Sequence, residues 1–137
     1  MFSTPALILA AALTLQPAET SVIEITFDVG AEDGVIMAAL FDSEEAWDGG
    51  GAAVRGVRID VAGGERVARF EGLPPGDYAL RAFHDVNSDG EMNANPFGMP
   101  TEPYGFSNNA VGNMGPASWE RAHFAVSGET RQTITLR

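Results

Sequence analysis

Apolar and polar residues alternate with a period of two along most of the chain after Thr20. In residues 21–29 the apolar residues Ile23, Ile25 and Phe27 share one face, which predicts a half-buried strand. Residues 35–42 are apolar on both faces, as in a central strand. An Asp-Gly turn separates the two segments and predicts that they pair as a hairpin.

Two more strands are predicted in residues 54–73, on either side of a Gly-Gly turn. The register of the second is open, because Val67 and Phe70 do not share a face. Residues 73–85 form the clearest strand, with His84 in phase with Tyr78.

The remaining chain has one helical signal, two strands and a long irregular segment. Ser43 is placed to cap one helical turn, which three glycines then end. Residues 121–128 and 129–137 alternate around a Ser-Gly turn, whereas residues 86–118 show no period and are rich in Asn, Gly and Pro. About seven strands without a long helix predict an all-β fold, an antiparallel β-sandwich with one long loop.

Residues 1–19 differ from this pattern. The apolar run Ala6–Leu15 is too short to span a bilayer and is typical of a secretory signal peptide, although no basic residue precedes it. The alternative is a first strand or a buried helix. The signal peptide hypothesis predicts an exported protein, periplasmic or extracellular, whose residues 20–137 form a single domain.

Charge and cysteine content narrow the classes of partner. The 137-residue chain has a net charge of −11, and all its basic residues are arginine. This imbalance disfavours nucleic acid and anionic lipid, both of which require basic patches. The chain has no cysteine, so its stability depends on the core and on any bound ion.

The segment "HDVNSDGEMN" is the strongest candidate for chemistry. It begins as the calcium loop pattern Asp-x-Asp/Asn-x-Asp/Asn-Gly, in which alternate side chains turn oxygens inward and the glycine permits a sharp bend. We predict Ca²⁺ as the ion, because the donors are oxygens. The predicted ligands are Asp85, Asn87, Asp89, Glu91 through its carbonyl, and Asn93.

The loop departs from the helix–loop–helix calcium site in two ways. Pro96 occupies the twelfth position, where a bidentate Glu is required, and a strand rather than a helix enters the loop. Further oxygens must come from elsewhere, and the nearest candidates are Asn95, Glu102, Asn108 and Asn109. The alternative is a series of Asx-turns around Gly90 that binds no metal.

An enzymatic role has little support in the sequence. There is no cysteine nucleophile and no Gly-x-Ser-x-Gly motif, and any serine could be matched with a histidine as Ser107 can. A hydrolase or lyase using Asp85, Glu102 and His84 is kept as an alternative. A histidine in phase with an apolar strand face is more often a packing residue than a catalytic one.

Two long blocks, "FHDVNSDGEMNAN" and "PTEPYGFSNNA", resemble the DUF2141 family of exported bacterial proteins. The resemblance covers nearly all of residues 21–136. It implies no particular activity, because none is assigned to the family. It implies that both blocks lie at one end of the sandwich, with second-block contacts from Glu102, Tyr104, Ser107, Asn108 and Asn109. By analogy it also suggests a transthyretin-like or Ig-like sandwich.

Together these observations predict an exported, non-enzymatic module with a calcium-stabilised loop. The expected partner is a glycan, a small ligand or an envelope protein. A purely structural envelope protein with an inert loop remains the second alternative.

Overall fold

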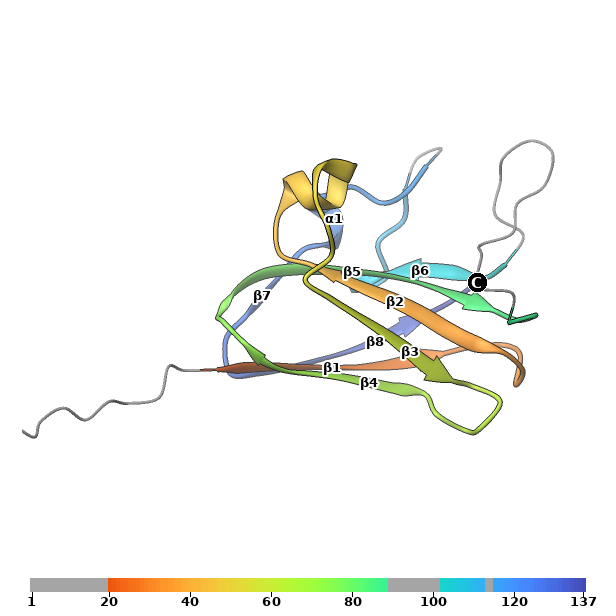
Figure 1. The fold of residues 1–137 in the computed structure, drawn as a ribbon. Coiled ribbons are helices and arrows are strands. Elements are labelled where there is room, and N and C mark those ends of the chain that lie inside the picture. The colour runs from red at the N-terminus through yellow and green to blue at the C-terminus, as the bar shows by residue number, and fades with distance from the viewer. Residues whose placement is uncertain (1–19, 89–101, 113–114) are drawn as a thin grey trace, which may run out of the picture.

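The computed structural model describes residues 20–88, 102–112 and 115–137, and its strands form two stacked sheets (Figure 1). Sheet A has the strand order β4-β1-β8, and sheet B has the order β3-β2-β5-β6, with β7 also paired to β5. The prediction of an all-β sandwich is confirmed, with eight strands among the described residues. The strands are β1 Ser21–Asp28, β2 Val35–Phe41, β3 Arg55–Asp60, β4 Val67–Leu73, β5 Gly76–Asp85, β6 Tyr104–Phe106, β7 Phe124–Val126 and β8 Glu129–Thr135.

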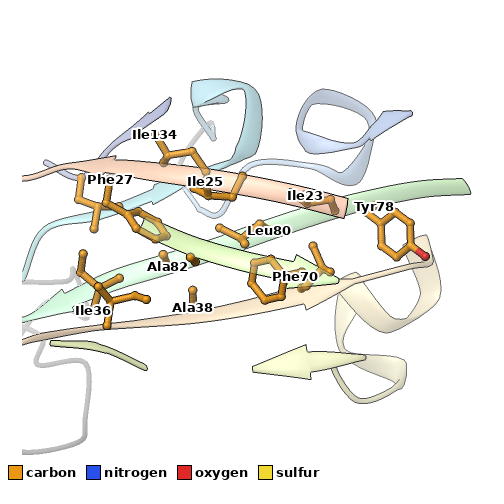
Figure 2. Close-up of a cluster of buried hydrophobic side chains, with 14 of the residues drawn as sticks. Ile23, Ile25, Phe27, Ile36, Ala38, Phe70, Tyr78, Leu80, Ala82 and Ile134 are labelled. Carbon is orange, nitrogen blue, oxygen red and sulfur yellow. The ribbon is translucent and has the colours of Figure 1, made fainter. Parts of the chain in front are cut away.

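The main core lies between the two sheets. Figure 2 shows Ile23 and Ile25 of β1 facing Leu80 of β5, and all three side chains are fully buried. Each such side chain stabilises the fold by about 1.5–3 kcal/mol relative to exposure. As the alternation predicts, Tyr78, Leu80, Ala82 and His84 share the inner face of β5, and Ile134 closes the core from β8.

The predicted hairpin of the first two strands is wrong. β1 belongs to sheet A and β2 to sheet B, so the connection between them passes from one sheet to the other at one end of the sandwich. The apolar inner faces of the two strands belong to the same core, to which each sheet contributes one of them. An Asp-Gly pair specifies that the chain reverses, but it does not specify whether the flanking strands then hydrogen-bond.

The pairing of β1 with β8 is parallel, although the other strand pairs are antiparallel. Beyond β8 the chain makes one more hydrogen bond to β1 and then joins the other sheet. The Leu136 N–H donates to the Asp28 carbonyl over 3.0 Å, and Tyr104 and Arg137 then exchange backbone hydrogen bonds of 3.0 and 3.2 Å. The C-terminal residues thus connect sheet A to β6 of sheet B (Figure 1).

β4 carries a β-bulge near its C-terminal end. Ser21 pairs with Leu73 and Ile23 with Phe70, so one extra residue lies on the β4 side. Gly72 has φ +71° there, a conformation that glycine adopts without strain. Ahead of the bulge the register is regular, so Ala68 and Phe70 face the core and Val67 faces solvent, and the extra residue lets Leu73 face the core as well.

A second, smaller core covers part of the outer face of sheet B. Trp47 packs edge-on against Phe41 and Phe106, and its indole N–H donates to the Ala117 carbonyl over 2.9 Å. Trp47 lies in the predicted helical turn, η2 (Ala46–Gly50), whose first N–H is capped by the Ser43 hydroxyl. Helix α1 (Trp119–Ala122) contributes to this core, and a further short helix, η3 (Ser107–Asn109), follows Phe106 directly.

Helix α1 corrects the predicted strand over residues 121–128. Ser118 caps α1 by accepting a hydrogen bond from the Arg121 N–H, so Arg121 and Ala122 are helical and β7 begins only at Phe124. The residue pattern did not predict β6, which is only three residues long.

Tyr78 provides a test of the core through pH. Its hydroxyl donates to the Pro74 carbonyl over 2.6 Å, and burial, assisted by the charge of Asp42, raises its pKa above the ordinary value of 10.0. Above about pH 10 the unfolded chain loses this proton while the folded chain keeps it, so stability is full below that pH and falls as pH rises.

We therefore expect Tyr78→Phe to lower stability by about 1 kcal/mol near neutral pH and to weaken the loss of stability in alkali. Urea unfolding at about pH 8 and about pH 11 measures both effects. Tyr104→Phe, which removes a hydroxyl from a ring that is 37% exposed, is the control. An alkaline loss as steep in Tyr78→Phe as in the wild type would contradict the prediction.

Candidate functional site at the end of strand β5

Two other segments hold the end of β5 from which the acidic loop begins. The His84 N–H donates to the Pro103 carbonyl over 2.8 Å, and the Val86 N–H donates to Glu102 Oε2 over 2.9 Å. On the other side, the β1–β2 connection is so close that a Cβ added to Gly34 would lie 2.2 Å from the Asp85 carbonyl oxygen. Residues 29–34, 84–88 and 102–103 therefore form one packed end of the sandwich.

Two buried carboxylates flank the start of the loop. Asp85 is fully buried and Glu102 is 8% exposed. Burying a carboxylate costs several kcal/mol unless hydrogen bonds or a cation compensate, and the Val86 N–H supplies one hydrogen bond to Glu102. The structure thus brings two predicted site residues, one from each sequence block, to the same end of the sandwich, where Glu102 accepts from the residue that follows Asp85.

The loop starts as a tight turn. The Ser88 N–H donates to the Asp85 carbonyl over 3.2 Å, and Ser88 has φ +56°. Asn87, at the centre of the turn, is exposed. Within the described ranges, no three His, Asp or Glu side chains form a group that could hold a metal ion. The predicted residues Asp89, Gly90, Glu91, Asn93 and Asn95 lie outside the described residues.

His84 is a packing residue at the base of this end. Its side chain is fully buried, and Nε2 lies 2.6 Å from the Asp33 carbonyl oxygen, a contact that a protonated Nε2 makes as donor. Among the residues that the structure describes, Nδ1 has no hydrogen-bond partner. A histidine with no exposed surface cannot reach a substrate, so its position argues against the hydrolase or lyase alternative.

Ser107, from the second block, is also fully buried and connects three elements. Its hydroxyl oxygen accepts from the Leu80 N–H over 2.9 Å and lies 2.6 Å from the Ala122 carbonyl, to which it donates. Leu80 lies between the part of β5 that pairs with β6 and the part that pairs with β7. The serine hydroxyl therefore takes the place of a strand at this point of the β5 edge.

The two asparagines of the second block bond to backbone groups of β8 and of the α1 region. Asn109 donates from Nδ2 to the Thr133 carbonyl over 3.0 Å and accepts at Oδ1 from the Thr135 N–H over 2.9 Å. Asn108 donates from Nδ2 to the carbonyls of Arg121 and His123. Both residues have a positive φ, +62° at Asn108 and +51° at Asn109, which asparagine tolerates better than most residues.

The structure therefore separates the second block into two parts. Glu102 reaches the acidic loop, whereas Ser107, Asn108 and Asn109 complete the edges of β5 and β8. Tyr104 lies between them on the outer face of sheet B, paired with Phe83. Hydrogen bonds to backbone groups account for both polar side-chain atoms of Asn109 and for Nδ2 of Asn108, whereas Oδ1 of Asn108 accepts from Gln132 Nε2.

Sequence reasoning missed the contribution of the β1–β2 connection. Asp33 contacts His84 through its carbonyl, and Gly34 permits the close approach to Asp85 with φ +78°. The Asp-Gly signal was visible in the sequence, but its contact with a segment 51 residues further on was not, since no local pattern encodes it.

Fold and site define a small two-sheet β-domain in which an acidic loop leaves the sheet at a buried aspartate, Asp85, beside a second buried carboxylate, Glu102. The chain belongs to the DUF2141 family, since the family model described as "Uncharacterized protein conserved in bacteria (DUF2141)" matches residues 23–135. No curated protein and no solved structure matches the chain. The transthyretin-like or Ig-like likeness therefore stays a prediction.

A search of the described residues for membrane spans finds no helix that is long and apolar enough to cross a bilayer.

Proposed function

We propose that this protein is an exported, non-enzymatic β-sandwich module whose acidic loop binds a calcium ion and is ordered by it. The observation that supports the proposal best is the placement of Asp85 and Glu102. Both carboxylates are buried where the acidic loop leaves β5: Asp85 is the last residue of that strand, and Glu102 accepts from the next N–H, that of Val86.

The donor set suits a hard cation. Asp85, Asn87 and Glu102 offer oxygen atoms at the described end of the loop, and the sequence adds Asp89 and Asn93. Residues 86–118 contain no lysine or arginine, so no cationic side chain of this segment can offset the acidic charge. A divalent ion would offset it and would satisfy several oxygens at once.

The ion would stabilise the fold and would take no part in a reaction. With few carboxylates in the loop, we expect a dissociation constant of about 0.1–1 mM, as in extracellular calcium modules. At about 10 mM Ca²⁺ such a site stabilises the folded state by about 1.4–2.7 kcal/mol. For a domain of this size that free energy raises the melting temperature by several degrees.

Thermal melts of residues 20–137 in EDTA and in about 10 mM Ca²⁺ test the proposal. We expect Ca²⁺ to raise the melting temperature of the wild type and to have no effect on Asp89→Asn, which keeps the shape of the side chain but removes its charge. Asp48→Asn is the matched control, because Asp48 is an exposed aspartate on η2. It should keep the full response to Ca²⁺.

Equal responses of Asp89→Asn and Asp48→Asn would show that Ca²⁺ acts on general acidic charge. The absence of any response in the wild type would favour an inert loop built of Asx-turns.

Export is supported by the apolar run Ala6–Leu15 and its small flanking residues. Expression in a Gram-negative host with a C-terminal tag tests it. We expect the protein in the periplasm or medium, with its N-terminus between Ala18 and Ser21. A cytoplasmic protein that retains Met1 would contradict export and leave the calcium proposal untouched.

The proposed biological role is the binding of a partner at the cell envelope, with a glycan, a small ligand or an envelope protein as candidates. The end of the sandwich where the acidic loop begins lies next to the part of the outer face of sheet B that the second core does not cover. The residues exposed on that part of the face favour one of these candidates.

A further inference from the structure

Five residues form a straight row across the outer face of sheet B. The strand registers pair Arg58 of β3 with Met37 of β2, Met37 with Phe83 of β5, and Phe83 with Tyr104 of β6. Tyr104 and Arg137 exchange backbone hydrogen bonds, which places Arg137 at the far end, where the C-terminus lies beside β6 (Figure 1). Directly opposed residues share a face of a sheet, so this row presents Met, Phe and Tyr between two arginines.

The second core leaves this row uncovered. Trp47 and α1 pack over Phe41, Ala79 and Phe106, which lie further along the same face. In the row itself Tyr104 is 37% exposed, and Met37 and Phe83 are partly exposed. A hollow of about 460 Å³, lined by Tyr104, Val111 and Thr135 among others, adjoins the Tyr104 end.

The arginines on this face differ from the others. Elsewhere arginine side chains bond to carboxylates or carbonyls, as Arg69 does to Glu24 and Arg55 to the Glu71 carbonyl. Within the described part of the chain, Arg58 and Arg137 make no side-chain hydrogen bond or ion pair, and both are exposed. The guanidinium of Arg81, in the next row, lies over the rings of Phe41 and Trp47, at 4.4 and 5.5 Å from their centroids.

We propose that this arginine-flanked row is a docking surface for a protein whose contact patch is apolar at its centre and carries carboxylates at its rim. Arg, Met, Phe and Tyr are enriched in protein–protein interfaces. The exposed apolar residues of the row match an apolar centre on the partner, and the arginines at its two ends match carboxylates at the partner's rim. The proposal deepens the envelope-binding role by choosing a protein partner, and it does not require the calcium ion.

A second copy of the chain fits the row poorly. Two rows face to face would set arginine against arginine, and each copy has a net charge of −11. The same net charge slows the approach of any acidic partner at low salt. At about 0.15 M salt the screening length is about 8 Å, so distant carboxylates lose most of their effect while contacts with Arg58 and Arg137 persist.

The test uses two synthetic peptides, Glu-Thr-Leu-Thr-Phe-Thr-Glu and the same sequence with Lys at both ends. In an extended peptide the end residues are about 20 Å apart, which matches the row of five, about 19 Å across four strand spacings. Each peptide is titrated into isotopically labelled residues 20–137 at about 0.15 M salt, once in EDTA and once in Ca²⁺.

We expect the Glu peptide to shift the amide resonances of Met37, Phe83 and Tyr104 in both media and to bind about tenfold more tightly than the Lys peptide. The double variant Arg58→Glu/Arg137→Glu should reverse this preference. Arg131→Glu is the matched control, because Arg131 is an exposed arginine on sheet A, and it should leave the preference unchanged.

Three results would overturn the proposal: no shift at the row, equal binding of both peptides, or an unchanged preference in the double variant. A dimer formed through this face would also overturn it and would appear as row shifts that depend on protein concentration alone. Loss of the melting response to Ca²⁺ with peptide binding retained would reject the calcium site and leave this surface standing.

Discussion

Replacing Gly34 with alanine should destabilise the domain by about 3–5 kcal/mol. The added Cβ would lie 2.2 Å from the Asp85 carbonyl oxygen and 2.7 Å from Val86 Cα, both backbone atoms that cannot rotate away. The left-handed φ of +78° adds strain for any residue with a Cβ. Chemical denaturation of the variant measures the loss.

Gly128→Ala separates the overlap from the strain. Gly128 has nearly the same φ, +77°, but its Cβ would meet nothing within 4 Å. We expect it to cost only about 1–2 kcal/mol. Equal losses of stability in the two variants would mean that the β1–β2 connection does not pack tightly against Asp85 and Val86, where the acidic loop begins. If the calcium proposal holds, Gly34→Ala should also weaken the response to Ca²⁺, whereas Gly128→Ala should not.

Removing the Ser107 hydroxyl should have the second largest effect. Ser107→Ala leaves the Leu80 N–H and the Ala122 carbonyl without their partner in a fully buried place. An unsatisfied buried group costs about 1–3 kcal/mol, so the two together should cost about 2–4 kcal/mol. Hydrogen exchange at the Leu80 amide should become faster in step with the loss of stability.

Ser127→Ala is the matched control, because Ser127 is an exposed serine in the β7–β8 turn. It should change stability by less than about 0.5 kcal/mol. If Ser107→Ala proved as mild as Ser127→Ala, the hydroxyl would not be the link between β5 and α1.

The sequence located the strands well and their partners poorly. The alternation of Ile23, Ile25 and Phe27 marked β1 and its inner face correctly, because burial on one face is a local signal. The pairing of β1 with β4 and β8 depends on residues far away in the chain, and no turn residue encodes it. A turn sequence such as Asp33-Gly34 serves equally for a hairpin and for a crossing between sheets.

The predicted ligands stay a prediction, but the structure does bring two of the residues singled out in the sequence, Asp85 and Glu102, to one end of the sandwich. Asp85 and Asn87 were identified by their spacing, and Glu102 by its place in the second block, where it meets the Val86 N–H. The role of Ser107 was not predictable, because a serine that replaces a strand partner differs from any other serine only through its tertiary contacts. The same holds for Asn109 and its two hydrogen bonds to β8.

The parallel pairing of β1 with β8 has a consequence for how the chain acquires its fold. Ser21 and Gly128 are hydrogen-bonded although they are 107 positions apart, and contacts of such long range slow folding. A nascent chain that still lacks β8 holds β1 by one edge alone and leaves the apolar core open. We therefore expect it to remain unfolded, and accessible to chaperones or to an export machinery, until synthesis is complete.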